Sequence, residues 1–191
     1  MEFSVLISVY QRENPLYLKQ ALDSLYVQIV PPSEVVIVED GPLTDGLHAV
    51  INAFSTQHPT KIVRLPHNQG LGKALCEGLK HCRFPIVARM DSDDICMPRR
   101  FEKQLSIMEN TKVDIVGSWI DEFSGSKRHV VSTRKVPEFQ AEILRFARHR
   151  NPMNHPTVMF RKQVIEAIGS YQDLKLFEDY DLWVRALQAG A

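Results

Sequence analysis

The sequence predicts an α/β fold with a mostly parallel sheet flanked by helices and a less regular second half. Short runs of apolar, branched residues recur along the first half, each too brief for a helix and bounded by polar residues. Between them lie longer segments whose apolar residues recur at helical spacing. Strands that are apolar on both faces and alternate with helices are typical of βαβ units with right-handed crossovers. We therefore expect a Rossmann-like first half.

Four strands and three helices are expected before residue 95. The strands are 3–9, 35–38, 61–65 and 84–90. Asn14 followed by Pro15 indicates the start of the first helix, which should end at Pro31. The third helix should end near His81. The inward faces of the three helices are Leu18, Ala21, Leu22 and Leu25; Leu47, Val50, Ile51 and Phe54; and Leu71, Leu75 and Leu79.

The alternation loosens after Asp94. We expect a helix over 98–110, a strand over 114–123, a hairpin strand over 127–132, a helix over 137–148, a strand over 157–161 and a last helix over 180–189. No internal repeat or linker divides the chain, so residues 1–191 are expected to form one domain. The chain stops at Ala191 just after an amphipathic stretch, which favours a longer parent protein.

Composition excludes several classes of protein. The 191 residues contain 23 Lys and Arg against 23 Asp and Glu, so no bulk cationic field favours nucleic acid as a partner. No apolar run approaches the roughly 18–20 residues of a membrane span. The first residues lack the basic start and small-residue cleavage site of a signal peptide. The cysteines are an odd set without a CxxC pair, which favours a reducing cytoplasm; they are Cys76, Cys82 and Cys96.

Acidic residues follow two of the expected strands. In an open α/β sheet, ligands bind beyond the carboxyl ends of the strands. Five carboxylates fall there, namely Glu39, Asp40, Asp91, Asp93 and Asp94. Several like charges held together favour a cation between them, and hard cations such as Mg²⁺ or Mn²⁺ prefer carboxylate oxygens. The sequence therefore predicts a metal bound to a phosphate group at this edge.

Other interpretations of these residues stay open or are weakened. An acidic turn such as Glu39-Asp40 can be only a helix cap or a solvated loop. An EF-hand loop requires Gly where Cys96 stands. No P-loop is present, and Gly70-Leu71-Gly72 lacks the third Gly of a dinucleotide-binding loop. Lys73 could meet a phosphate or a base edge, or it could simply lie in the first turn of a helix.

Five segments in order carry a resemblance that covers nearly the whole chain. They are SVLISVYQRENPLYL, VVIVEDGPLTD, HNQGLGKALCEGL, ARMDSDDICMPRRFEKQ and FEDYDLWVRA. The chain resembles inverting family-two glycosyltransferases with the GT-A fold, above all the bacterial members that build lipopolysaccharide, capsule or exopolysaccharide repeat units. The resemblance implies a nucleotide-binding half at 1–95 and an acceptor-side half at 96–191.

The resemblance also implies roles for individual residues. Ser8, Tyr10 and Asp40 match positions that hold the nucleotide base, commonly uracil, and Glu39 replaces the first acid of the usual DDGS. Asp91 and Asp93 match the DxD motif, whose acids contact ribose and ligate Mn²⁺ or Mg²⁺, and Asp94 follows as in many relatives. Glu178 and Asp179 match the pair whose Asp is the catalytic base, although Asp179 could also be only a favourable charge at a helix start. His155 would face the acceptor or the leaving phosphates.

The expected reaction transfers a sugar from a nucleoside diphosphate, expected to be UDP, to an acceptor hydroxyl with inversion. A lipid-linked saccharide acceptor would place the enzyme peripherally at the inner face of a membrane. Basic clusters at 127–129 and 145–150 could favour such a surface, or they could be solvated faces. The alternatives are a sugar-nucleotide-binding fragment without activity and a metal-dependent nucleotidyl- or phosphotransferase. The latter should have a Gly-rich loop after the first strand, which is absent.

Overall fold

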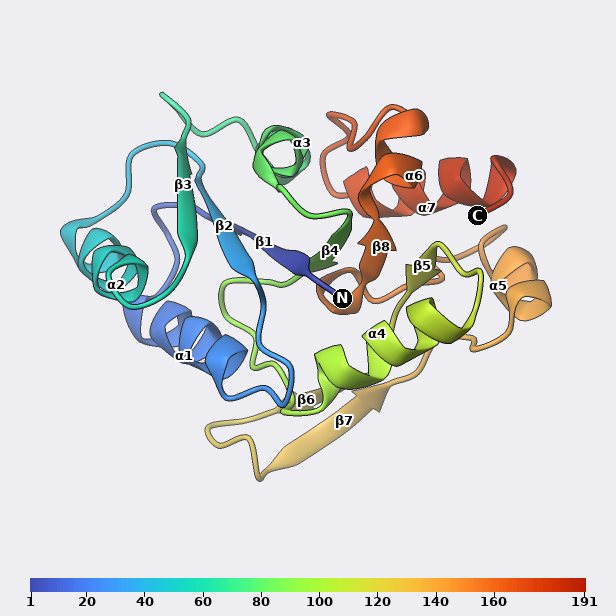
Figure 1. Ribbon diagram of the computed structural model, residues 1–191, viewed down its shortest axis with the longest axis horizontal. Coiled ribbons are helices and arrows are strands. Elements are labelled where there is room, and N and C mark those ends of the chain that lie inside the picture. Colours follow the sequence, from blue (N-terminus) through green and yellow to red (C-terminus); the bar gives the residue numbers. More distant parts are fainter.

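The computed structural model describes residues 1–191 and places a six-stranded sheet between two layers of helices (Figure 1). The strand order is β3-β2-β1-β4-β8-β5, and a separate two-stranded sheet pairs β6 with β7. The strands β1 to β4 run parallel, whereas β8 is antiparallel to both of its neighbours. The prediction of a mostly parallel sheet flanked by helices is confirmed.

The first half follows the predicted order of elements. These are β1 (Phe3–Val9), α1 (Pro15–Tyr26), β2 (Glu34–Glu39), α2 (Asp45–Ser55), β3 (Thr60–Arg64), α3 (Leu71–His81) and β4 (Ile86–Arg89). The side chain of Asn14 caps α1 by accepting a hydrogen bond from the Leu16 N–H at 2.8 Å, as its residue type predicts. The helix ends at Tyr26, earlier than the predicted stop at Pro31.

The second half departs more from the prediction. Its elements are α4 (Arg100–Asn110), β5 (Ile115–Val116), β6 (Ile120–Phe123), β7 (Val130–Arg134), α5 (Gln140–Phe146), the 3₁₀ turn η1 (His155–Thr157), β8 (Met159–Arg161), α6 (Lys162–Ala167) and α7 (Glu178–Gln188). The predicted helix over 137–148 is shorter, the hairpin strand lies later than 127–132, and α6 was not predicted.

The single strand predicted over 114–123 is wrong. Its two ends form β5 and β6, which belong to different sheets. The backbone between them is bound to the loop before β8, because the Ser118 N–H donates to Thr157 Oγ1 at 2.9 Å and Asn154 Nδ2 donates to the Ser118 carbonyl at 2.9 Å. These bonds satisfy backbone groups that a continuous strand would pair within a sheet.

Two apolar cores explain why the parallel strands contain few polar residues. Val5 and Ile7 on β1 pack towards α1, α2 and α4, whereas Leu6 between them packs towards α3, α6 and α7. Figure 1 shows these two groups of helices on opposite sides of the sheet. A strand covered on both faces is apolar at most positions and lacks a strict alternation with polar residues, which is the pattern seen in the sequence.

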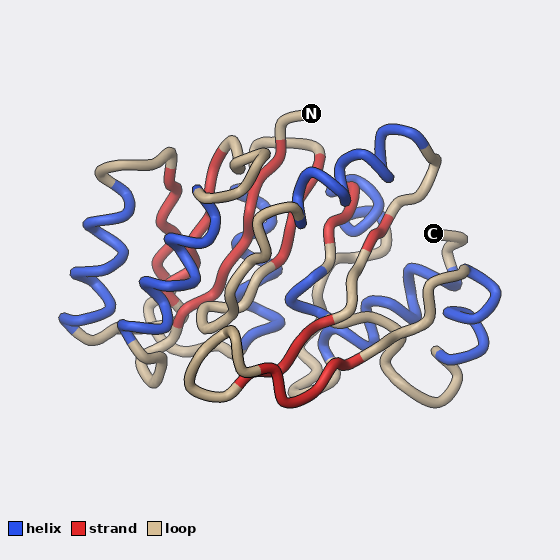
Figure 2. Tube along the Cα trace, turned by 90° about the horizontal axis from the view of Figure 1, so that it is seen from below, coloured by secondary structure: helices blue, strands red, loops and turns tan.

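The β6–β7 hairpin stands apart from both cores. Every residue from 121 to 135 is exposed, and α5 buries none of its residues. In Figure 2 β1 runs from the N-terminus at the top towards the lower part of the molecule, where the hairpin also lies. The hairpin is therefore on the side to which the parallel strands point their carboxyl ends. None of the helices is both long and apolar enough to cross a membrane.

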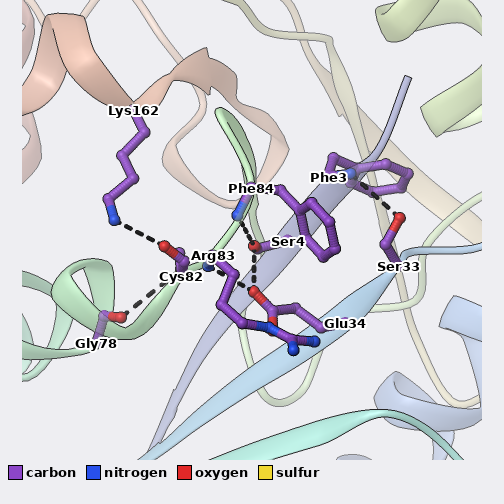
Figure 3. Close-up of polar contacts among 9 residues, drawn as sticks. All are labelled: Phe3, Ser4, Ser33, Glu34, Gly78, Cys82, Arg83, Phe84 and Lys162. Atoms are coloured by element: carbon purple, nitrogen blue, oxygen red, sulfur yellow. Dashed lines mark hydrogen bonds and ion pairs between the residues drawn. The ribbon is translucent and has the colours of Figure 1, made fainter.

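A buried carboxylate joins three segments at the other end of the parallel strands, where these strands begin. Glu34 Oε1, at the start of β2, accepts hydrogen bonds from Ser4 Oγ at 2.6 Å and from the Arg83 N–H at 2.7 Å (Figure 3). Glu34 Oε2 accepts from Arg83 Nε at 2.6 Å. Burial alone would raise the pKa of Glu34, but the hydrogen bonds from Ser4 and Arg83 and the charge of Arg83 lower it overall. Glu34 thus ties β2 to β1 and to the segment that leads into β4.

Replacing Glu34 by Gln should lower the free energy of unfolding by about 1–2 kcal/mol at pH 7, because charged hydrogen bonds at a buried site are lost. Since the folded-state pKa is lowered, the carboxylate stabilises the protein above its unfolded pKa of 4.5, and this stabilisation disappears as the pH falls through the folded value. The difference from wild type should therefore shrink below pH 4.5. Chemical denaturation at several pH values measures it.

Glu77→Gln is the matched control. Glu77 also pairs with a cation, Lys80, but on the surface of α3, where an ion pair contributes little. Equal losses of stability in the two variants would contradict the role given to Glu34.

Candidate functional site

The acidic turn after β4 is fixed by buried hydrogen bonds. Arg100 Nη2 donates to the Arg89 carbonyl at 2.7 Å and to the Val158 carbonyl at 3.4 Å. Further along, the Cys96 N–H donates to Ser24 Oγ at 2.9 Å, and Gln28 Nε2 donates to the Cys96 carbonyl at 3.1 Å. The chain is therefore anchored on both sides of residues 91–94, and its acids are held at the carboxyl edge of the sheet.

Carboxylates crowd this turn. Burial, followed by repulsion from Asp91 and Asp93, raises the pKa of Asp94 to about 6. Glu13, from the loop after β1, joins the group: burial first, then the charges of Asp93 and Asp91, raise its pKa. Arg89 supplies a buried positive charge next to these carboxylates. Its side chain is only 1% exposed and forms an ion pair with Asp91.

These residues fit a divalent cation by their chemistry. No three His, Cys, Asp or Glu side chains are gathered into a ready-made ligand set. The donors nevertheless are carboxylate oxygens of the kind that Mg²⁺ and Mn²⁺ prefer. Burial first, and then the charges of Asp91 and Asp93, disfavour the ionised form of Asp94, and a bound cation would favour it. Asp93 is exposed and Asp91 half-buried, so both carboxylates border solvent.

The residues predicted to hold a nucleotide base lie at the ends of β1 and β2. Tyr10 is 39% exposed directly after β1, and Ser8 is half-buried within it. Asp40 is buried and braces the next loop, because Oδ1 accepts from the Gln69 N–H at 2.7 Å and Oδ2 from the Gly70 N–H at 3.1 Å. A carboxylate has about four acceptor positions, so these bonds leave room for a further donor.

Glu39 and Lys73 have partners of their own. Glu39 is buried and accepts from Arg64 Nε at 2.9 Å, with His48 Nδ1 at 3.6 Å from its other oxygen. Lys73 Nζ is 2.7 Å from Asp173 Oδ2, which joins the first turn of α3 to the loop before α7. The nucleotide contacts expected of both residues stay predictions.

Asp179 lies in the first turn of α7, in the other half of the chain from the acidic turn. Its Oδ2 accepts from Asn151 Nδ2 at 2.6 Å and its Oδ1 from the Tyr180 N–H at 2.7 Å. Burial raises the pKa of Tyr171, Arg89 opposes the shift, and the charges of Asp179 and Asp91 add to it. The charges of Asp91 and Asp179 thus both act on the same buried tyrosine. The predicted base and the predicted metal ligand therefore share a neighbour, although they come from different halves of the chain.

His155 is buried next to the site. Its Nε2 lies 3.1 Å from Tyr171 Oη, and its ring packs against the edge of Trp183. Burial, followed by the charge of Arg89, lowers the pKa of His155 well below its ordinary value, so the ring is neutral near pH 7. A neutral ring offers a phosphate a hydrogen bond but no charge, and the phosphate or acceptor contact stays a prediction.

Sequence reasoning missed four residues around the site, namely Glu13, Arg89, Asn151 and Tyr171. Glu13 belongs to the polar loop after β1, which the rule for strand ends could have included. Arg89 is a charged residue inside a predicted strand that is otherwise apolar, and that was a signal. Asn151 and Tyr171 lie in loops of ordinary composition, and only the fold brings them to Asp179.

Comparison with known proteins identifies the family. The model of Glycosyl transferase family 2 matches residues 4–169. The chain belongs to this family. It is 45% identical to the amylovoran biosynthesis glycosyltransferase AmsE of Erwinia amylovora, over 98% of this chain and 70% of that protein. It is 40% identical to the UDP-Gal:alpha-D-GlcNAc-diphosphoundecaprenol beta-1,3-galactosyltransferase of Escherichia coli, over 99% of this chain and 69% of that protein.

Solved structures agree in fold. TarS of S. aureus matches 97% of this family 2 chain with a TM-score of 0.74 and 24% identity, and the chain spans 33% of that protein. The mannosyltransferase PcManGT of Pyrobaculum calidifontis, solved with GDP-Man and Mn²⁺, matches 99% of the chain with a TM-score of 0.74 and 17% identity. The chain spans 52% of that structure. The GT-A fold predicted from the resemblance is confirmed.

Gly72 sets the distance between α3 and the helix that bears Asp179. A Cβ at Gly72 would lie 2.4 Å from the Gln172 carbonyl oxygen and 3.2 Å from Glu178 Cβ. Because the first contact is with backbone, Gly72→Ala should force α3 and the loop before α7 apart and lower the free energy of unfolding by about 1–3 kcal/mol. Chemical denaturation measures the loss.

Gly46→Ala is the matched control, since Gly46 is also the second residue of its helix and its Cβ would meet only the Pro15 side chain, at 3.1 Å. Alanine is the better helix former, so this variant should be near neutral or stabilised by a few tenths of a kcal/mol. A Gly72→Ala protein as stable as the control would show that the close approach is not required.

Proposed function

We propose that this family 2 glycosyltransferase transfers a sugar from a nucleoside diphosphate, UDP in the first instance, to an acceptor hydroxyl with inversion, in bacterial cell-surface polysaccharide synthesis. The observation that carries the proposal is the anchored acidic turn at the carboxyl ends of the strands, together with the carboxylate of Asp179, from the other half of the chain, held by Asn151. A donor held at the acidic turn would meet an acceptor activated at Asp179. Residues 1–95 would then bind the nucleotide and 96–191 the acceptor.

On the donor side, Ser8, Tyr10 and Asp40 are proposed to hold the base at the ends of β1 and β2. Asp91, Asp93 and Asp94 would hold a divalent cation against the diphosphate. When bound, the cation would act as a Lewis acid that neutralises charge developing on the leaving diphosphate. The solved TarS structures include complexes with UDP and with UDP-GlcNAc, which supports a nucleotide-sugar donor for this chain.

On the acceptor side, Asp179 is proposed as the general base, with Glu178 beside it. The acceptor oxygen attacks the anomeric carbon as its proton passes to Asp179. A new C–O bond forms, the bond from the anomeric carbon to the diphosphate oxygen breaks, and the nucleoside diphosphate leaves with the bonding electron pair. Attack from the face opposite the leaving group inverts the anomeric configuration.

The printed name of the Escherichia coli relative supports specific substrates to test. That protein transfers galactose from UDP-galactose to a GlcNAc-diphosphoundecaprenol acceptor. We therefore propose a UDP-sugar donor and a lipid-linked saccharide acceptor for this chain. UDP-galactose with a synthetic α-D-GlcNAc-diphospho-lipid is the first pair to assay.

Calorimetric titration with UDP, with and without Mn²⁺, tests the donor site. UDP should bind the wild-type protein only with metal, and Asp93→Ala should weaken this binding by at least about tenfold, because a metal ligand is lost. Asp23→Ala removes an exposed acid on α1 and should bind as wild type does.

Other outcomes of this titration are informative. If GDP or dTDP binds in place of UDP with the same metal dependence, the base assignment is wrong and the metal site stands. Binding that is independent of metal would favour the sugar-nucleotide-binding alternative without a catalytic cation. A folded sample that binds no nucleoside diphosphate would overturn the proposal.

A lipid-linked acceptor also calls for contact with a membrane surface, and the β6–β7 hairpin is the proposed contact. Its tip combines Lys127, Arg128 and His129 with the exposed apolar side chains of Phe123 and Val131. Basic side chains attract anionic headgroups, each contributing about 1 kcal/mol near the surface, and exposed apolar side chains can enter the interface. The hairpin lies on the side of the molecule where the parallel strands end (Figure 2).

Co-sedimentation with vesicles tests this contact. Binding to phosphatidylcholine vesicles that contain phosphatidylglycerol should exceed binding to phosphatidylcholine alone and should fall with salt. The double variant Lys127→Glu and Arg128→Glu should weaken it by more than about tenfold. Lys103→Glu with Lys112→Glu, both exposed but away from the hairpin, is the control with the same charge change. Equal losses in the two double variants would contradict a specific role for the hairpin.

A further inference from the structure

Asn151 lies in the loop between α5 and β8 and contacts the proposed base. Its Nδ2 donates to Asp179 Oδ2 at 2.6 Å, while the other carboxylate oxygen accepts from the Tyr180 N–H at 2.7 Å. Asn151 and Asp179 are both half-buried. One oxygen of Asp179 is therefore held by its own helix, and the other by a side chain that comes from a different part of the chain.

The orientation of the Asn151 amide is determined by a second bond. Its Oδ1 accepts from the Met153 N–H at 3.2 Å. A reversed amide would place the NH₂ group against that N–H and the oxygen against the carboxylate, so both contacts would become repulsive. The amide can therefore only donate towards Asp179.

A further bond joins the same two segments without involving the carboxylate. Tyr180 Oη donates to the Ala147 carbonyl at 2.6 Å. The start of α7 is thus attached twice to residues 147–151, once through the base and once beside it. This pair of contacts allows the function of Asn151 to be separated from simple attachment of the helix.

We propose that Asn151 is a positioning residue that holds the Asp179 carboxylate in the orientation required to accept the proton of the attacking hydroxyl. This inference rests on the proposed function. A hydrogen bond donated to a carboxylate favours its ionised form, which is the form a general base needs. With one acceptor position on each oxygen occupied, the remaining lone pairs are directed to receive the acceptor hydroxyl.

The charged and titratable groups around Asp179 are few. Glu178 and Asp181 lie on the same helix, and Asp181 is paired with Arg185. Tyr171 faces Asp179 from the loop before α7, and the Arg89–Asp91 pair lies beyond it. None of these groups donates a hydrogen bond to the carboxylate, so the contribution of Asn151 should be visible in the pH dependence of turnover.

The experiment compares Asn151→Leu with Tyr180→Phe. The assay follows UDP release from UDP-galactose in the presence of the α-D-GlcNAc-diphospho-lipid acceptor. If the protein does not transfer galactose to this acceptor, the assay follows hydrolysis, in which water is the acceptor. Asn151→Leu should lower kcat by about 10–100-fold, as expected for a misplaced catalytic group, and should move the acid limb of the pH–rate profile to higher pH. Its affinity for UDP should be unchanged. Asn151→Asp, which cannot donate and adds a like charge, should move the limb further.

Tyr180→Phe is the matched control, since it removes one oxygen and the neighbouring bond between the same segments. It should lower Tm to an extent similar to Asn151→Leu while the acid limb keeps its position. A limb that shifts equally in both variants would mean that Asn151 acts only by attaching α7, and the inference would be overturned.

Double variants separate this inference from the proposed function. Asp179→Asn should lower turnover by about 10²–10⁴-fold, and adding Asn151→Leu should lower it little further, because both changes remove the same action. An active Asp179→Asn protein would refute the assignment of the base. An inactive Asp179→Asn protein beside a fully active Asn151→Leu protein would refute only the role of Asn151. The Tm values of the same four proteins report their coupling even without turnover.

Discussion

The site depends on two guanidinium groups beneath an acidic turn. Arg89 is buried and pairs with Asp91, while Arg100 hydrogen-bonds the carbonyl of Arg89 itself. A buried positive charge is costly unless it is paired, and so is a crowd of carboxylates. The buried arginine charges and the crowded carboxylates therefore stabilise each other. The pairing keeps Asp91, Asp93 and Asp94 together at the sheet edge, and burial, followed by the charges of the two other acids, raises the pKa of Asp94.

The opposite wall of the site is set by close packing. Gly72 lets α3 approach the loop before α7, and Asn151 holds the carboxylate of Asp179 from a third segment. The proposed donor side is thus built on strand ends, where the backbone is fixed by the sheet ladder. The proposed acceptor side is built on loops and on the start of α7, which are joined by side-chain hydrogen bonds. Such loops can change without disturbing the sheet.

The sequence predicted the helices and strands of the first half well because more than one signal marks each of them. In β1, five of the seven residues from Phe3 to Val9 are apolar, and α1 begins at a cap and a proline, so several independent signals agree. The prediction for the second half was wrong where tertiary contacts determine the path of the backbone. The strand predicted over 114–123 is divided because Ser118 bonds to Thr157 and Asn154, which are distant in sequence. For the same reason, motifs in the sequence point to Asp91 and Asp179 but not to Asn151 and Tyr171, which only the tertiary structure brings close to Asp179.

The place of β8 in the sheet has a consequence for how the chain folds. β8 (Met159–Arg161) lies between β4 and β5, although more than forty residues separate it from either strand in sequence. During synthesis, β4 therefore remains an open edge until residues near 160 leave the ribosome. An apolar, unpaired edge is where nascent chains pair with the wrong partner. The completion of this enzyme's sheet is thus a late and vulnerable event, and a chaperone that shields β4 would act at that stage.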